Sequence, residues 1–127
     1  MTLPVTITIL IDDSEVVASR LGSLLTANPS INFAGRAKNI QEGYKLIEKI
    51  HPQVVIINSR LPDGTAISMI ANLKQKYPDL QIVILSNETN EYYKTKCLKM
   101  GATRVLDRSS DLPDIIDIID DIQKYLE

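Results

Sequence analysis

Five short runs of apolar and β-branched residues recur along the chain, and each is separated from the next by a stretch with helical spacing. The runs are VTITILI from Val5, INFAGR from Ile31, QVVIIN from Gln53, LQIVILS from Leu80 and TRVLD from Thr103. This alternation predicts right-handed crossovers and a parallel sheet with helices on both faces. The near-continuous apolar runs QVVII and QIVIL indicate strands buried on both faces. We therefore expect an α/β fold, with a five-stranded doubly wound parallel sheet.

The helices between these runs are predicted from apolar residues spaced by three and four. Four such stripes are Val17, Leu21, Leu24 and Leu25; Ile40, Tyr44, Ile47 and Ile50; Ile67, Ile70 and Leu73; and Tyr93, Cys97 and Met100. Gly101 follows the fourth stripe, where a left-handed helix cap is favoured. The last helix is expected in DLPDIIDIIDDIQKYLE, with Pro113 in the first turn, where no backbone donor is needed.

Length and charge limit the class of protein. A chain of 127 residues predicts a single domain, 1–127, with no sequence left for an output domain. The net charge of −2 disfavours direct binding of nucleic acid, and no apolar run approaches the ~18 residues of a membrane span. Cys97 is the one cysteine of the sequence, which is typical of a reducing compartment, so we expect a cytoplasmic protein. We expect Cys97 itself to be a buried structural thiol.

Polar residues stand at the carboxyl ends of the predicted strands, where ligands bind in open parallel sheets. They are Asp12 and Asp13 after the first strand, Asn58 after the third, Ser86 after the fourth, and Asp107 and Arg108 after the fifth. Two adjacent carboxylates can hold Mg²⁺ through their oxygens. An equally weighted alternative is that Asp13 or Ser14 only caps the following helix.

These segments carry a family resemblance. ILIDDS, VVIINSRLPDGTAISMI, VILSN and GATRVLDRSSDL resemble, in order and spacing, the strand-end motifs of response-regulator receiver domains, the CheY-like family. The match covers essentially the whole chain. It implies the strand order 2-1-3-4-5 and a place in a two-component phosphorelay pathway. No catalytic residue and no enzymatic activity of its own are expected.

In that family an acidic pair binds Mg²⁺, and an Asp at the end of the third strand accepts a phosphoryl group from a histidine kinase. A Ser or Thr and a Lys contact the phosphate, and an aromatic residue acts as a switch. Here Asp12 and Asp13 match the acidic pair, Ser86 matches the hydroxyl, and LPDG from Leu61 matches the loop after the acceptor strand. Three positions depart from the pattern: Asn58 stands at the phosphoacceptor position, Arg108 at the Lys position and Val105 at the switch position.

The departures predict a degenerate member. The amide of Asn58 is not a carboxylate nucleophile, so we expect no phosphorylation there. Asp12, Asp13 and Asn58 would hold Mg²⁺ weakly, and more weakly than an Asn58→Asp variant, because one negative charge is missing. Arg108 could close onto Asp12 or Asp13 and occupy the cation site internally. Val105 cannot act as the aromatic switch.

The sequence therefore predicts a stand-alone receiver-like signalling module that acts by protein–protein interaction. The alternative is a phosphorylation-competent receiver whose acceptor Asp was mutated to Asn58. With the Asp in place, such a receiver would accept phosphate from a histidine kinase. Slow deamidation of Asn58 would also regenerate a competent population. A flavodoxin-like nucleotide-binding protein is disfavoured, because the glycines are scattered and form no phosphate loop.

The last two helices are expected to offer a partner surface. Basic residues Lys94, Lys96 and Lys99 precede an acidic set formed by Asp111, Asp114, Asp117, Asp120 and Asp121. These charges could pair across a two-fold axis in a homodimer or bind another signalling protein, such as a histidine kinase. The alternative is a solvated charged face. Several isoleucines of the last helix are expected near the surface. His51 is expected in a surface loop and not as a phosphodonor.

Overall fold

A five-stranded parallel sheet forms the centre of the molecule, with the strand order β2-β1-β3-β6-β7. We analysed a computed structural model, which describes residues 5–88 and 90–126. The sheet strands are β1 (Thr6–Ile11), β2 (Ile31–Ala37), β3 (Val54–Asn58), β6 (Gln81–Ser86) and β7 (Arg104–Asp107). The helices are α1 (Glu15–Thr26), α2 (Ile40–Ile50), α3 (Ile67–Lys76), α4 (Glu91–Met100) and α5 (Ile115–Leu126). The predicted doubly wound fold is confirmed. The predicted strand order 2-1-3-4-5 is confirmed too, because β6 and β7 are the fourth and fifth strands of this sheet, while β4 and β5 form a separate hairpin.

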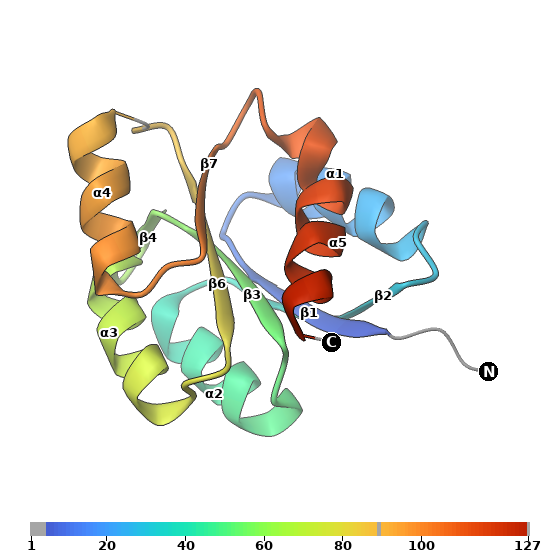
Figure 1. Ribbon diagram of the computed structural model, residues 1–127, viewed down its shortest axis with the longest axis horizontal. Coiled ribbons are helices and arrows are strands. Elements are labelled where there is room, and N and C mark those ends of the chain that lie inside the picture. Colours follow the sequence, from blue (N-terminus) through green and yellow to red (C-terminus); the bar gives the residue numbers. More distant parts are fainter. Residues whose placement is uncertain (1–4, 89, 127) are drawn as a thin grey trace.

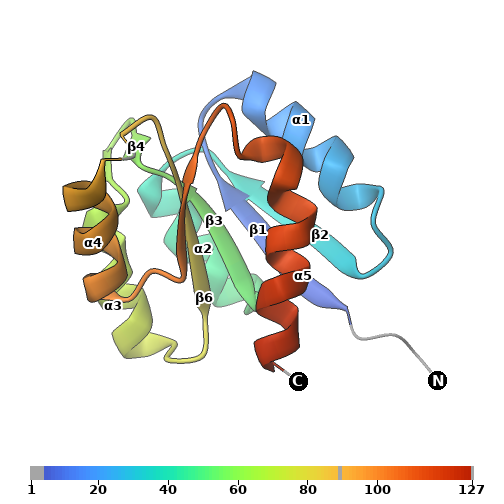
Figure 2. The same ribbon diagram turned by 45° about the horizontal axis from the view of Figure 1, so that its top comes forward.

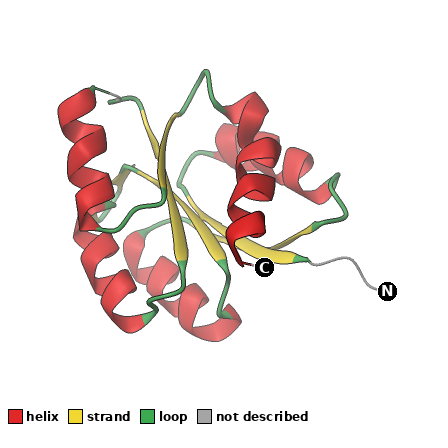
Figure 3. Ribbon diagram, viewed as in Figure 1, coloured by secondary structure: helices red, strands yellow, loops and turns green. Residues whose placement is uncertain are grey.

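Helices cover both faces of the sheet, in three layers (Figure 1, Figure 3). Helices α1 and α5 lie side by side on one face, and α2, α3 and α4 lie on the other (Figure 2). Successive residues of each strand point to opposite faces, so Ile9 and Ile11 join the α2–α4 core while Leu10 joins the α1–α5 core. Two separate apolar cores result, one on each side. In the described residues no helix is long and apolar enough to cross a membrane.

The helix ends follow from local sequence. Ser14, Asn39 and Asn90 each accept a hydrogen bond from a backbone N–H of the first turn that they cap. Gly101 ends α4 with a φ of 122°, a conformation that favours glycine, as expected. His51 ends α2 in the left-handed conformation, with a φ of 52°, and its side chain is exposed.

Two details differ from the sequence prediction. A short hairpin, β4 (Arg60–Leu61) and β5 (Gly64–Thr65), follows β3, and no apolar run indicated it, because each strand is only two residues long. The last helix does not begin at Asp111. Residues Leu112–Asp114 form a 3₁₀ turn, η1, with Pro113 inside it, and α5 follows. A proline suits this first turn, since the backbone donor that it lacks would be unpaired there.

Gly43 provides a test of the close packing between α2 and β1. A Cβ built there would lie 2.5 Å from Cδ1 of Ile11, which is buried, whereas one built at Gly22 in α1 would meet Phe33 at an ordinary 3.5 Å. We expect Gly43→Ala to lower the free energy of unfolding, because overpacking costs roughly 1–3 kcal/mol and outweighs the gain of about 1 kcal/mol from the helix preference of alanine. Gly22→Ala, the matched control, should be neutral or stabilising, because alanine favours helices. Urea unfolding measures both, and equal effects would contradict the prediction.

Candidate functional site

The carboxyl ends of β1, β3, β6 and β7 meet at one edge of the sheet, as parallel pairing requires. Three polar residues lie buried there: Asp12 after β1 and Ser86 at the end of β6 are fully buried, and Asn58 at the end of β3 is 8% exposed. Asp13, in contrast, is exposed. The edge therefore brings together the residues predicted from sequence, but the two neighbouring carboxylates have different surroundings.

The carboxylate of Asp12 is paired with Arg108. Nη2 of Arg108 donates to Oδ1 of Asp12 at 2.8 Å and to Oδ2 at 3.1 Å. The backbone N–H of Ser14 also donates to Oδ1, at 2.9 Å. The hypothesis that Arg108 closes onto one of the two acidic residues is thus confirmed for Asp12. This is a charge-assisted interaction in a site removed from water, which strengthens it.

The loop between β7 and α5 holds Arg108 in place. The backbone N–H groups of Ser109 and Ser110 donate to Oδ1 of Asp107 at 2.8 and 2.9 Å. These hydrogen bonds hold the pKa of the Asp107 carboxyl below its usual value. The backbone N–H of Arg108 donates to the carbonyl of Ser86 at 3.0 Å, which fixes the start of the arginine side chain beside the end of β6.

A second arginine lies against Asp12 from β2. Nε of Arg36 donates to the backbone carbonyl of Asp12 at 3.0 Å, and its Nη1 pairs with Glu15 at 3.0 Å. The pairing with Arg36 holds the pKa of the Glu15 carboxyl below its usual value. Arg108 thus balances the carboxylate of Asp12, while Arg36 pairs with Glu15 and contacts the backbone of Asp12. The sequence analysis did not predict the role of Arg36, since it lies inside an apolar run.

Ser14 is the residue that caps α1. Its Oγ accepts from the backbone N–H of Val17 at 3.2 Å, while Asp13 makes no capping bond to that helix. The capping alternative is therefore confirmed for Ser14 and wrong for Asp13.

The side chain of Asn58 is oriented by the chain that follows it. Its Nδ2 donates to the carbonyl of Arg60 at 2.7 Å. The backbone N–H of Ser59 donates to the carbonyl of Leu85 at 2.8 Å. Deamidation proceeds when the following backbone nitrogen attacks the side-chain amide, and here that nitrogen is held in a hydrogen bond. The structure therefore opposes the slow regeneration of an Asp at this position.

Tyr93 of α4 is a site residue that the sequence analysis assigned only to the core. Its side chain lines a small cavity together with Ser59. Burial raises the pKa of Tyr93 to about 12, although the nearby hydroxyls of Ser86 and Ser59 act to lower it. Val105, at the switch position, is half-buried and packs against the core on the same side of the sheet. An aromatic side chain thus lies near the phosphate-pocket serine from α4 instead of from β7. The sequence spacing could not reveal this position of Tyr93, because Tyr93 also fits the apolar stripe with Cys97. Cys97 itself is buried, and burial raises the pKa of its thiol.

The loop after β3 is tied to α2 by Asp63. Its carboxylate accepts from the backbone N–H of Ile40 at 2.8 Å and of Gln41 at 3.1 Å. These bonds to an α-helix N-terminus hold the pKa of the Asp63 carboxyl below its usual value. The loop that carries the family-like LPDG segment is therefore attached to the start of α2, which lies 22–23 residues earlier in the sequence.

Comparison with known proteins agrees with this geometry. Residues 8–120 match the family described as the response regulator receiver domain. The chain belongs to this receiver domain family. The fold superimposes on the signal receiver domain of the response regulator NarL from Mycobacterium tuberculosis with a TM-score of 0.87, at 19% identity and over 95% of this chain and 98% of that one. At that identity the likeness shows the CheY-like fold alone.

Two curated relatives are full regulators. The DNA-binding transcriptional activator DevR/DosR of Mycobacterium tuberculosis is 33% identical over 74% of this receiver domain and 43% of its own length. The transcriptional regulatory protein DegU of Brevibacillus brevis is 25% identical over 87% of this chain and 47% of its own length. The receiver domain thus spans less than half the length of these relatives.

The Mg²⁺ ion that the family implies does not fit the residues at this edge. Both carboxylate oxygens of Asp12 are engaged by Arg108, Asp13 points into an exposed position, and the third position offers the neutral Asn58. Within residues 5–88 and 90–126, no group of three or more His, Cys, Asp and Glu side chains is arranged to hold a metal ion. A hard divalent cation needs several free oxygen ligands, and this edge supplies too few.

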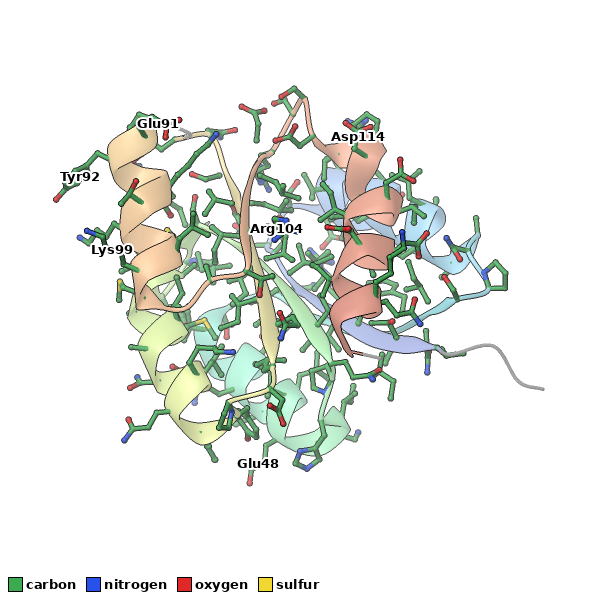
Figure 4. The ribbon with its side chains drawn as sticks, in the orientation of Figure 1. Glu48, Glu91, Tyr92, Lys99, Arg104 and Asp114 are labelled. Carbon is green, nitrogen blue, oxygen red and sulfur yellow. The ribbon has the colours of Figure 1, made fainter. Side chains whose placement is uncertain are left out.

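The basic residues of α4 do not share one helix face, and the acidic residues predicted to pair with them differ in exposure. Lys94 is half-buried and lies near Asp107, whereas Lys96 lines a small cavity beside Ser59 on the other side of α4. Residues two apart on a helix differ by about 200° in direction, so one row cannot hold both. Lys99 and Tyr92 point away from the body of the protein (Figure 4). Of the acidic set, Asp114 and Asp117 are exposed, while Asp121 pairs with Arg104 at 2.8 Å.

The interaction of Asp63 with α2 predicts a dependence on pH. Because the folded-state pKa of Asp63 is lowered, its ionised form stabilises the fold above the ordinary carboxyl pKa, and that contribution is lost as pH falls through the lowered value. We expect Asp63→Asn to lower the Tm at neutral pH, with the difference from the parent chain closing in acid. Glu48→Gln, at an exposed position on α2 (Figure 4), is the control and should show no such dependence. A Tm difference that is constant with pH would contradict the assignment.

Proposed function

We propose that this receiver domain signals by protein–protein contact and is not phosphorylated at position 58. The observation that carries the proposal is the amide of Asn58 at the end of β3, where the family has its acceptor carboxylate. An amide does not form an acyl phosphate, and this one donates to the carbonyl of Arg60. The site is then a structural junction between loops and performs no enzymatic reaction of its own.

Its partners would be a histidine kinase or another signalling protein, reached without direct contact to nucleic acid or membrane. The near-neutral net charge gives no basic footprint for nucleic acid. DevR/DosR, which is named as DNA-binding, is more than twice as long as the segment that it shares with this chain. The single cysteine is buried and free, which agrees with a reducing cytoplasm.

We expect no phosphoryl group on the parent chain. The test is the intact mass after incubation with acetyl phosphate and Mg²⁺, with a receiver domain that carries an acceptor Asp as the positive control. The parent chain should keep its mass, because its strand end offers no carboxylate nucleophile at position 58. A gain of one phosphoryl group on the parent chain would contradict the proposal and favour a competent receiver that uses another acceptor.

The exposed charges suggest that one such contact is a homodimer through α4 and α5. Lys99 and Tyr92 lie exposed on α4, and Asp114 and Asp117 lie exposed on α5. A two-fold axis that brings α4 of one copy against α5 of the other would place Lys99 near the acidic residues of the second copy.

Sedimentation velocity over a range of concentrations should show a dimer that weakens with salt. We expect Lys99→Glu to weaken it and the double variant Lys99→Glu/Asp117→Lys to restore it, because the paired charges are exchanged. Lys45→Glu, an exposed change on α2, is the matched control. A monomer at every concentration would leave a different protein as the partner of this surface.

A further inference from the structure

The ion pair between Arg108 and Asp12 joins two strands that are not neighbours. In the sheet, β3 and β6 lie between β1 and β7. Neighbouring strands are about 4.8 Å apart, so the ends of β1 and β7 are separated by roughly 14 Å. Nη2 of Arg108 nevertheless reaches both oxygens of Asp12. The arginine side chain therefore crosses the ends of β3 and β6, where Asn58 and Ser86 lie.

The burial of Asp12 explains why this side chain is held. The Asp12 carboxylate is fully buried, and Arg108 is 20% exposed. A buried carboxylate without a counter-charge is strongly unfavourable. The arrangement has a cost, because Nε of Arg108 is buried without a hydrogen-bond partner among the described residues. Arg108 thus lies where its charge balances that of Asp12, although its Nε–H is left without a partner among the described residues.

We propose that the Arg108 guanidinium is the resident cation of this site, and that it closes position 58 to Mg²⁺ and to phosphodonors. This inference deepens the proposed function, since it adds a second block that acts independently of Asn58. The structural reason is that the same oxygens cannot serve both cations. Mg²⁺ would need the Asp12 oxygens in its own octahedral shell, and it would lie beside a fixed positive charge.

The difference between arginine and lysine matters here. A lysine, which the family has at this position, carries one compact ammonium group on a flexible stem. The guanidinium is planar and more weakly hydrated than an ammonium group, and here its Nη2 donates to both oxygens of Asp12. Arg108 therefore remains on Asp12, and the ends of β1 and β7 stay connected whether or not a divalent ion is present. The junction is expected to be insensitive to Mg²⁺.

The test restores the family residues at positions 58 and 108, first one at a time and then together. The variants are Asn58→Asp alone, Arg108→Lys alone and the double variant Asn58→Asp/Arg108→Lys. The matched control is Asn58→Asp/Arg104→Lys, which changes an arginine at the start of β7 that pairs with Asp121. Mg²⁺ binding is measured by titration calorimetry, phosphorylation by intact mass with acetyl phosphate, and folding by circular dichroism and Tm.

We expect Asn58→Asp alone to bind Mg²⁺ about tenfold or more weakly than Asn58→Asp/Arg108→Lys, because the guanidinium stays on the Asp12 oxygens that the ion needs, whereas a lysine ammonium on its flexible stem can leave them. Phosphate should accumulate on the double variant and only slowly on Asn58→Asp or on the Arg104 control. Arg108→Lys alone should gain Mg²⁺ affinity relative to the parent chain without gaining phosphate.

Two results would overturn the inference, and neither depends on the proposed function. One is equal Mg²⁺ affinity and equal phosphorylation of Asn58→Asp and Asn58→Asp/Arg108→Lys. The other is a parent chain that binds Mg²⁺ as tightly as Arg108→Lys. Phosphorylation of the unchanged parent chain, in contrast, would overturn the proposed function. If the double variant is unfolded by circular dichroism, the comparison of the parent chain with Arg108→Lys still decides the question.

Discussion

The parallel pairing of five strands is the constraint on which the site depends. It brings the carboxyl ends of β1, β3, β6 and β7 to one edge, although Asp12 and Arg108 are 96 residues apart in sequence. Helices on both faces form two apolar cores and bury the inner strands β1, β3 and β6 almost completely. A side chain at the end of one strand therefore has defined neighbours on the others.

Electrostatic balance at this edge distinguishes the chain from the family pattern. A buried carboxylate requires a counter-charge, and here Arg108 supplies it for Asp12 while Arg36 contacts the backbone of the same residue. The neutral Asn58 adds no further negative charge. A carboxylate-rich edge that would attract a divalent cation is thus replaced by one whose buried carboxylate is paired with an arginine of the same chain.

Most of the fold could be predicted from the sequence. The β-branched runs and the three-and-four spacing identified the strands and helices, because each buries a face with its own period. The short β4–β5 hairpin and the 3₁₀ start before α5 could not be predicted, since two- or three-residue elements carry no periodic signal. For the site, Asp12, Asn58, Ser86 and Arg108 were found from strand ends and family spacing. Tyr93 and Arg36 were missed, because both also fit apolar or strand patterns.

The sequence by itself determined which chemical groups stand at the strand ends, and above all that position 58 holds an amide. Only the tertiary structure decided how those groups are paired. Asp12 and Asp13 are adjacent in sequence, yet Asp12 is fully buried and paired with Arg108, whereas Asp13 is exposed. Likewise the lysines of α4 are close in sequence but face different sides. The physical reason is that pairing and burial depend on strand order and helix direction, which bring together residues that are distant along the chain.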